Sequence, residues 1–195
     1  RMLAARVVFM PTTRSASERE RAAASSGFLS SPGRSCANAS PIFCRGRHIF
    51  LALGMWNEVV SQNVIASGPD RSRWRPGHYT LWLQYGLLQL GRVAEADSLR
   101  RATLANAGTP LEGGRASYAL EMRAGQVVNG RQWRDPDLAA PLAVLRPSVG
   151  AEAADAFAQG YAALQRGEPA LAAVQRVRLQ DVQARAASQP GYTQP

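Results

Sequence analysis

The sequence predicts an all-α fold, a solenoid of stacked helical hairpins that begins near residue 48. The first observation is a recurring glycine: Gly54, Gly91, Gly130 and Gly167 are separated by 37, 39 and 37 residues. The second is that apolar residues at helical spacing stand on both sides of these glycines, as in "LLQLGRVAEA" and "ALQRGEPALA". The third is the lack of alternating apolar and polar residues over any useful length, which argues against β-strands.

Residues 1–47 differ from the rest in composition. They hold 8 arginines against only two acids, Glu18 and Glu20, and are rich in Ser, Ala and Pro. An acid-poor segment of this kind also resembles an organelle transit peptide. We expect it to be disordered or non-native, apart from one short helix, and the chain to be a fragment of a longer protein. Because the pattern is lost abruptly at Arg47, our hypothesis is a truncated or frame-shifted reading of the gene.

The predicted repeat domain spans residues 48–188. A helix from before His48 to Leu53 turns at Gly54 and is followed by a helix over 56–66. The segment 67–77 is dense in turn residues and predicts a loop. The next hairpin is expected to have helices over 78–90 and 93–106.

The third and fourth hairpins follow a predicted turn at 108–114. The third has a helix over 115–129 and a second part from 131 onward, in which a helix starts at Asp135 with Pro136 at its first position. Pro141 is expected to shorten or bend this helix. Ser148 is a candidate N-cap for the fourth hairpin, which we expect to have helices over 150–166 and 168–188. Residues 189–195 are predicted to be a disordered tail.

The units "WLQYGLLQLGRVAEADSL" and "FAQGYAALQRGEPALAAV" resemble the tetratricopeptide repeat family, whose fold is an alpha-alpha superhelix of hairpins. In this resemblance a small residue, Gly160, lies where the helices cross, and Ala96 and Ala172 lie early in the second helices. "HIFLALGMWNEVVSQN" is similar to a bacterial subgroup of the family. Three features depart from the pattern: the period exceeds the usual 34 or so, the first unit lacks a recognisable first half, and Arg123 stands where a small residue is expected.

The resemblance implies a function as a non-enzymatic scaffold for protein–protein interaction. In the family the first helices of the hairpins line the concave face, and a protein or peptide segment binds there. Aligning the units on their glycines gives the residues of this expected groove, which are His48, Leu81, Tyr85, Leu88, Gln89, Leu120, Phe157, Tyr161, Leu164 and Gln165. The alternative is that the aromatic residues among them are ordinary packing between repeats. These positions lack the set of Arg, Lys and Asn residues that would capture a C-terminal carboxylate.

No pattern typical of catalysis or of a cofactor is present in the sequence. His48 and His78 have no Ser, Cys or carboxylate partner at a recognisable spacing. Cys36, Cys44 and His48 form C-x7-C-x3-H, which matches no common zinc motif, so we expect two free thiols. We therefore predict no enzymatic activity, no cofactor and no metal.

The charge of +9 comes from 23 basic residues that are all arginine, as a GC-rich genome produces. Residues 48–195 hold 15 arginines against 12 acids, so most of the excess lies outside the repeats. We therefore expect no nucleic-acid partner; an RNA-binding helical repeat and an accessory fragment of a larger enzyme remain the alternatives. The longest apolar run, 49–56, is too short for a membrane span. We expect a cytoplasmic protein, or a periplasmic one if a native export signal is missing from this fragment.

Overall fold

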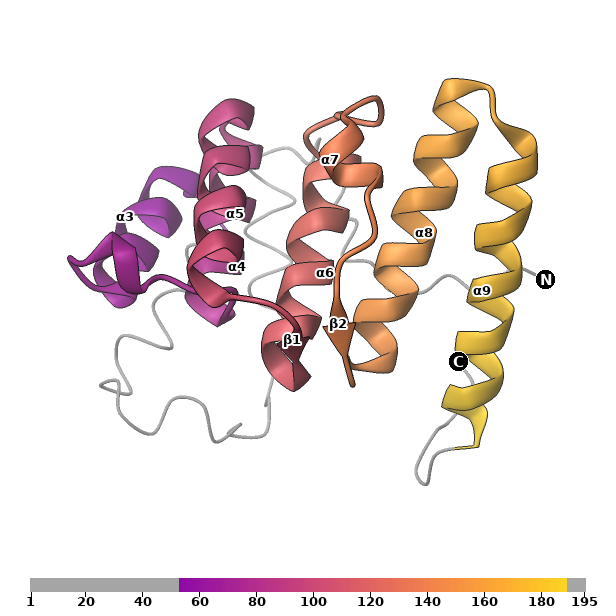
Figure 1. Ribbon diagram of the computed structural model, residues 1–195. Helices are drawn as coiled ribbons and strands as arrows, with labels where there is room; N and C mark the ends of the chain where they lie inside the picture. Colours follow the sequence, from indigo (N-terminus) through magenta and orange to yellow (C-terminus); the bar gives the residue numbers. More distant parts are fainter. Residues whose placement is uncertain (1–52, 189–195) are drawn as a thin grey trace.

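The computed structural model describes residues 53–188 and is mostly helical, as predicted (Figure 1). The predictions for residues 1–47, for the helix that begins before His48 and for the tail 189–195 lie outside the described residues. The elements in chain order are α3 (Trp56–Ser67), η2 (Arg71–Arg73), α4 (His78–Gln89), α5 (Val93–Ala107), β1 (Leu111–Glu112), α6 (Gly113–Val128), α7 (Pro136–Ala139), β2 (Val144–Leu145), α8 (Val149–Arg166) and α9 (Pro169–Ala187). Among the described residues, no helix is long and apolar enough to cross a membrane.

The long helices follow one another across the molecule from α3 to α9, and α4 and α5 overlap in this view (Figure 1). Helix α4 packs against α3, α5 and α6, and α8 packs against α6 and α9. Apolar side chains fill the space between them: one buried cluster joins Leu83 and Leu87 to Ala96, and another joins Val127 to Ala158. Each helix therefore depends on its neighbours for burial of its apolar face.

Gly91 and Gly167 form the predicted turns between helices, and Gly54 lies in the turn just before α3. Gly54, Gly91 and Gly167 have φ of 68°, 72° and 77°, a left-handed conformation that glycine adopts without a steric cost. The fourth differs, because at Gly130 the left-handed residue is the next one, Arg131, with φ of 53°. A Cβ on Gly130 would lie 2.5 Å from the backbone oxygen of Gln126, so close approach explains this glycine.

The third hairpin differs from the prediction, because α6 has no long second helix as its partner. Helix α7 begins as expected: the Asp135 side chain accepts a hydrogen bond of 2.9 Å from the Asp137 backbone, and Pro136 follows the cap. The helix ends after four residues. Ala140 is extended, as a residue before proline prefers to be, and Pro141 has no N–H to continue the helix.

The chain after α7 instead runs as an extended segment back along α6. Its strand β2 pairs in parallel with β1, in the register Leu111 to Val144. The sequence prediction missed this pairing, because each strand has only two residues and shows no alternation. Helix α6 accordingly packs directly against α8.

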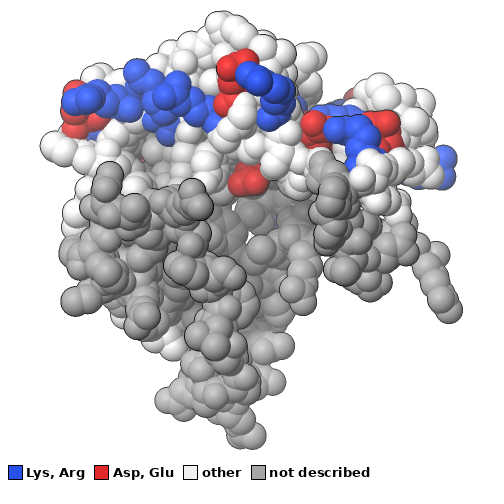
Figure 2. Space-filling view, turned by 90° about the horizontal axis from the view of Figure 1, so that it is seen from below, with Lys and Arg blue, Asp and Glu red and all other residues white. Residues whose placement is uncertain are grey.

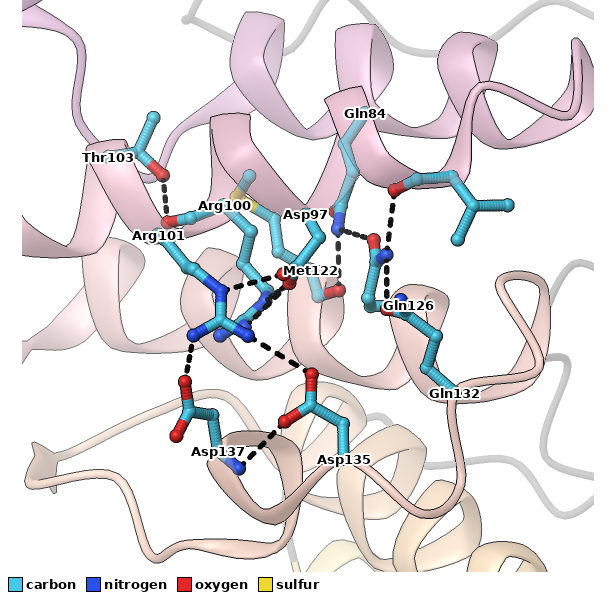
Figure 3. A network of polar contacts seen from close by, with 11 residues as sticks. Gln84, Asp97, Arg100, Arg101, Thr103, Met122, Gln126, Gln132, Asp135 and Asp137 are labelled. Atoms are coloured by element: carbon cyan, nitrogen blue, oxygen red, sulfur yellow. Dashed lines mark hydrogen bonds and ion pairs between the residues drawn. The ribbon is translucent and has the colours of Figure 1, made fainter.

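Polar contacts fix the irregular segment that replaces the second helix (Figure 3). The Gln126 side chain of α6 donates to the Gln132 side chain at 2.7 Å and to the Val93 backbone oxygen at 3.1 Å. Arg101 of α5 pairs with Asp135 at 3.1 Å and with Asp137. Because Asp135 also caps α7, this arginine holds the short helix by its first turn.

An ion triad centred on the buried carboxylate of Asp155 joins α6, α8 and α9. The guanidinium of Arg123 donates to both carboxylate oxygens of Asp155, at 2.7 and 2.8 Å, and to the Ala140 backbone oxygen at 2.6 Å. Arg178 of α9 donates to the same carboxylate at 2.9 Å. Asp155 is fully buried. Arg123, which stands where the resemblance predicted a small residue, is therefore a structural cation with a specific counterion.

Candidate functional site

The first helices of the hairpins, α4, α6 and α8, each present one face that the other described helices do not bury. On α4 this face carries His78, Leu81, Trp82, Tyr85 and Gln89, all half-buried. Residues spaced three or four apart share one side of a helix, so these side chains form a stripe along α4. We call the combined surface of the three helices the α4–α6–α8 face.

Aromatic rings dominate the α4 part of this face. Trp82 and Tyr85 meet edge to face with ring centroids 6.1 Å apart, and Trp56 of α3 meets Tyr85 at 5.7 Å. His78 lies 6.1 Å from Trp82. Burial raises the pKa of the Tyr85 hydroxyl above its usual 10, so this group stays a neutral donor and acceptor.

A second aromatic group belongs to α8. Phe157 and Tyr161 stack with centroids 6.2 Å apart, and Trp133, from the loop after α6, meets Tyr161 edge to face at 6.1 Å. Phe157 and Tyr161 are half-buried, whereas Leu164, one turn further along, is 60% exposed. The two aromatic groups lie on either side of α6, which packs against both α4 and α8.

The structure separates the predicted groove residues into three groups. Leu81, Tyr85, Gln89, Phe157 and Tyr161 are half-buried on the α4–α6–α8 face, and Leu164 and Gln165 are exposed. Leu88 and Leu120 differ from the prediction, since they are only 6% and 1% exposed and belong to the helical core. His48 lies outside the described residues.

One residue of this face, Glu121, escaped the sequence prediction. It is half-buried on α6, between the buried residues of the helix, and it lies nine residues before Gly130, as Trp82 lies nine before Gly91. Burial raises the pKa of the Glu121 carboxyl above its usual 4.5. Burial and the charge of Glu121 both raise the pKa of Tyr118. Comparing the residues that stand nine positions before the turn glycine in each repeat would have identified Glu121 from the sequence.

A second surface feature is an open depression of about 760 Å³ at the C-terminal end of α5 and the N-terminal end of α6. Its lining consists of Pro76, Ala107, Pro110, Leu111, Glu112, Gly114, Arg115 and Tyr118. Most of this lining is apolar or backbone. Its polar side chains are those of Glu112, Arg115 and Tyr118.

Charged side chains gather along one edge of the molecule, where arginines and acids alternate (Figure 2). Arg146 pairs with Glu112 at 2.8 Å, and Arg185 pairs with Asp181 at 2.9 Å and with Glu152. Acids therefore offset part of the basic charge. Within residues 53–188, no three His, Cys, Asp or Glu side chains are grouped so that they could hold a metal ion.

Comparison with known proteins gives no relative: no family model, no curated protein and no solved structure matches this chain.

Proposed function

We propose that this chain is a non-enzymatic interaction scaffold of the tetratricopeptide type, which binds a peptide or protein segment on the α4–α6–α8 face. The observation that carries the proposal is the partial exposure of two aromatic groups on helices that flank α6. Tyr and Trp at a surface supply large contact area at a small entropic cost, and they are enriched among residues that dominate binding energy.

The shape of the surface supports a segment as the ligand. The aromatic groups belong to α4 and α8, which both pack against α6, so a ligand that contacts both groups crosses three helices. A helix is about 10 Å wide with its side chains, so such a ligand is longer than a small metabolite. Extended and helical peptide segments have this length.

The charges on the same face argue against RNA as the ligand. A nucleic-acid interface needs arginines that point at phosphates. The α4–α6–α8 face instead has the carboxylate of Glu121 at its centre, and eight of the arginines in residues 53–188 form ion pairs with acids. An RNA-binding repeat and an accessory part of a larger enzyme stay alternatives that no observation here favours.

A selection from a random peptide library displayed on phage tests the proposal. Recovered peptides are synthesised, and their affinity is measured by fluorescence polarisation for the wild type and for Tyr85→Ala, Phe157→Ala and Leu164→Ser. We expect losses of roughly tenfold or more for the aromatic variants, since hot-spot truncations cost about 2 kcal/mol or more. Leu164→Ser keeps the test valid if an aromatic variant unfolds, because Leu164 is 60% exposed.

Val174→Ala is the matched control, because Val174 is also 60% exposed but lies on α9, outside the proposed surface. Its affinity for the recovered peptides should equal that of the wild type. The proposal is wrong if the library yields no peptide whose binding depends on the residues of the α4–α6–α8 face.

A further inference from the structure

Glu121 stands out among the acids of the described chain. Six acidic side chains in residues 53–188 are buried or half-buried: Asp97, Glu121, Asp135, Glu152, Asp155 and Glu168. Five of these six pair with an arginine, at the distances of ordinary ion pairs or closer. Glu121 alone has no arginine partner among the described residues. Its neighbour Tyr118 is a neutral phenol that does not compensate the charge.

An unpaired carboxylate that is half removed from water destabilises the fold, because burial of a charge without a counterion is unfavourable. The chain pairs its other acids of similar burial, so the exception at Glu121 needs a physical reason. Its location supplies one. Glu121 lies on α6, in the middle of the three helices that form the α4–α6–α8 face.

The helices on either side of Glu121 carry aromatic rings, and such rings together with a carboxylate suit a cation. The rings of Trp82 and Tyr85 belong to the neighbouring helix on one side, and those of Phe157 and Tyr161 to the helix on the other. Aromatic faces attract the cationic ends of Lys and Arg, and a carboxylate forms a charge-assisted hydrogen bond with either. The aliphatic stems of these side chains also pack on apolar surfaces.

We infer that the segment bound on the α4–α6–α8 face inserts a lysine or arginine side chain between the two aromatic groups, where its charge pairs with Glu121. The inference rests on the proposed function and specifies the chemistry of the partner. It also accounts for the unpaired carboxylate, since the partner supplies the missing counterion.

The test uses the peptides recovered from the random library, together with their variants. We expect a Lys or Arg at one position of the enriched peptides. Replacing this residue with norleucine, which keeps the stem and removes the charge, should weaken binding to the full chain about tenfold or more. Glu121→Gln in the protein should weaken binding of the original peptide by a similar factor.

The combination of the two changes gives the decisive measurement. If Glu121 pairs with the basic residue of the peptide, replacing that residue with norleucine should not weaken binding further once the protein carries Glu121→Gln. Glu121→Lys should bind the peptide with Glu at this position better than the original peptide. Glu95→Gln is the control, because it removes the same charge from an exposed acid of α5 that pairs with Arg92, and it should change no affinity.

Each outcome identifies which statement fails. Peptides whose binding depends on Tyr85 and Leu164, but that show no basic position or no coupling to Glu121, overturn the inference and leave the proposed function standing. A library that yields no peptide dependent on this face overturns both. Equal effects of Glu121→Gln and Glu95→Gln would assign the change to net charge alone and would likewise overturn the inference.

Discussion

Replacing Asp155 with Asn tests how the last two hairpins are held together. The wild-type carboxylate is 0% exposed and accepts from Arg123, whose side chain is 6% exposed, and from Arg178. Asn keeps the size of the side chain but removes the charge. The Arg123 guanidinium is then buried without a counterion, although its bond to the Ala140 backbone oxygen is retained.

The burial of each partner sets the expected order of effects. Removing one member of a buried ion pair costs about 3–5 kcal/mol, because the other charge stays behind uncompensated. Asp155→Asn should reach this range. Arg123→Met should cost less, since Asp155 keeps Arg178 at 2.9 Å. Arg178→Gln should cost only about 0–1 kcal/mol, because the Arg178 side chain is 38% exposed and its ion pair is screened by water.

Urea denaturation followed by circular dichroism at 222 nm or so measures these differences. A double variant, Arg123→Met with Asp155→Leu, serves as the control, because it removes both buried charges and should be more stable than Asp155→Asn alone. The reasoning is refuted if Asp155→Asn costs under about 1 kcal/mol, or if Arg178→Gln is as destabilising as Arg123→Met.

Three further predictions concern the turns, the helix crossings and the acid pH range. Gly160→Leu should lower the free energy of unfolding by about 1–3 kcal/mol in a urea melt, because a Cβ there would lie 3.2 Å from the Cβ of Gln175. Gly150→Ala in the same helix should raise it by up to about 1 kcal/mol, because its Cβ would meet nothing within 4 Å. A more stable Gly160→Leu would contradict the close crossing. Arg131→Gly should raise the melting temperature and add about 1 kcal/mol to the free energy of unfolding, because glycine adopts a φ of 53° without steric cost. An unchanged melting temperature would show that this conformation is not unfavourable for Arg131. Burial raises the pKa of Asp97, but hydrogen bonds from Arg101 and Arg100 outweigh this and hold the pKa below 3.8. The stability that this carboxylate contributes is therefore present above pH 3.8 and is lost as the pH falls through the lower pKa of the folded state. Asp97→Asn should destabilise the fold at neutral pH and should match the wild type in strong acid. An equal difference in stability at both pH values would be inconsistent with the ion pairs.

The helix boundaries could be predicted from the sequence because their signals are local. The expected helices over 78–90 and 93–106 are α4 and α5 within a residue or so. Ser148 does cap α8, with its hydroxyl accepting from the Ala151 backbone at 3.2 Å. Such signals depend only on residues within one turn of the helix end, so they can be found in a single sequence without knowing the fold.

The third hairpin could not be predicted in the same way, because long-range contacts decide its structure. The start of α7 was visible at Pro136, but the course of the chain after it depends on Arg101, which lies 34 residues before Asp135. The pairing of Leu111 with Val144 also joins distant segments. The periodic glycine even misled the prediction at Gly130, since a strict repeat implies the same second helix in every unit.

Some of the predicted groove residues lie on the α4–α6–α8 face and others do not, and the differences have one cause. Aligning the units on their glycines placed Tyr85, Phe157 and Tyr161 on a shared face, where the structure has them half-buried. The alignment does not determine how much of each aligned residue the neighbouring helix buries. It therefore included Leu120, which is 1% exposed, and passed over Glu121, one residue away on the open side of the same helix.

One register position shows how the same place in each hairpin serves a different purpose. The residue seven before the turn glycine is Gln84, Arg123 or Gly160. Gln84 donates from α4 to the Met122 backbone oxygen of α6 at 3.0 Å, and Arg123 donates from α6 to Asp155 of α8. In both cases a long polar side chain connects one hairpin to the next.

Gly160 occupies the equivalent position in α8, the first helix of the last hairpin that the structure describes. Its missing side chain lets α9 approach closely, with Gln175 where a Cβ would make a tight contact. Within residues 53–188 no further helix follows α9, so a connecting side chain at this position would have no later hairpin to reach. The small residue thus stands in the last described hairpin, where α9 packs closely on α8, and the polar residues stand where another described hairpin follows.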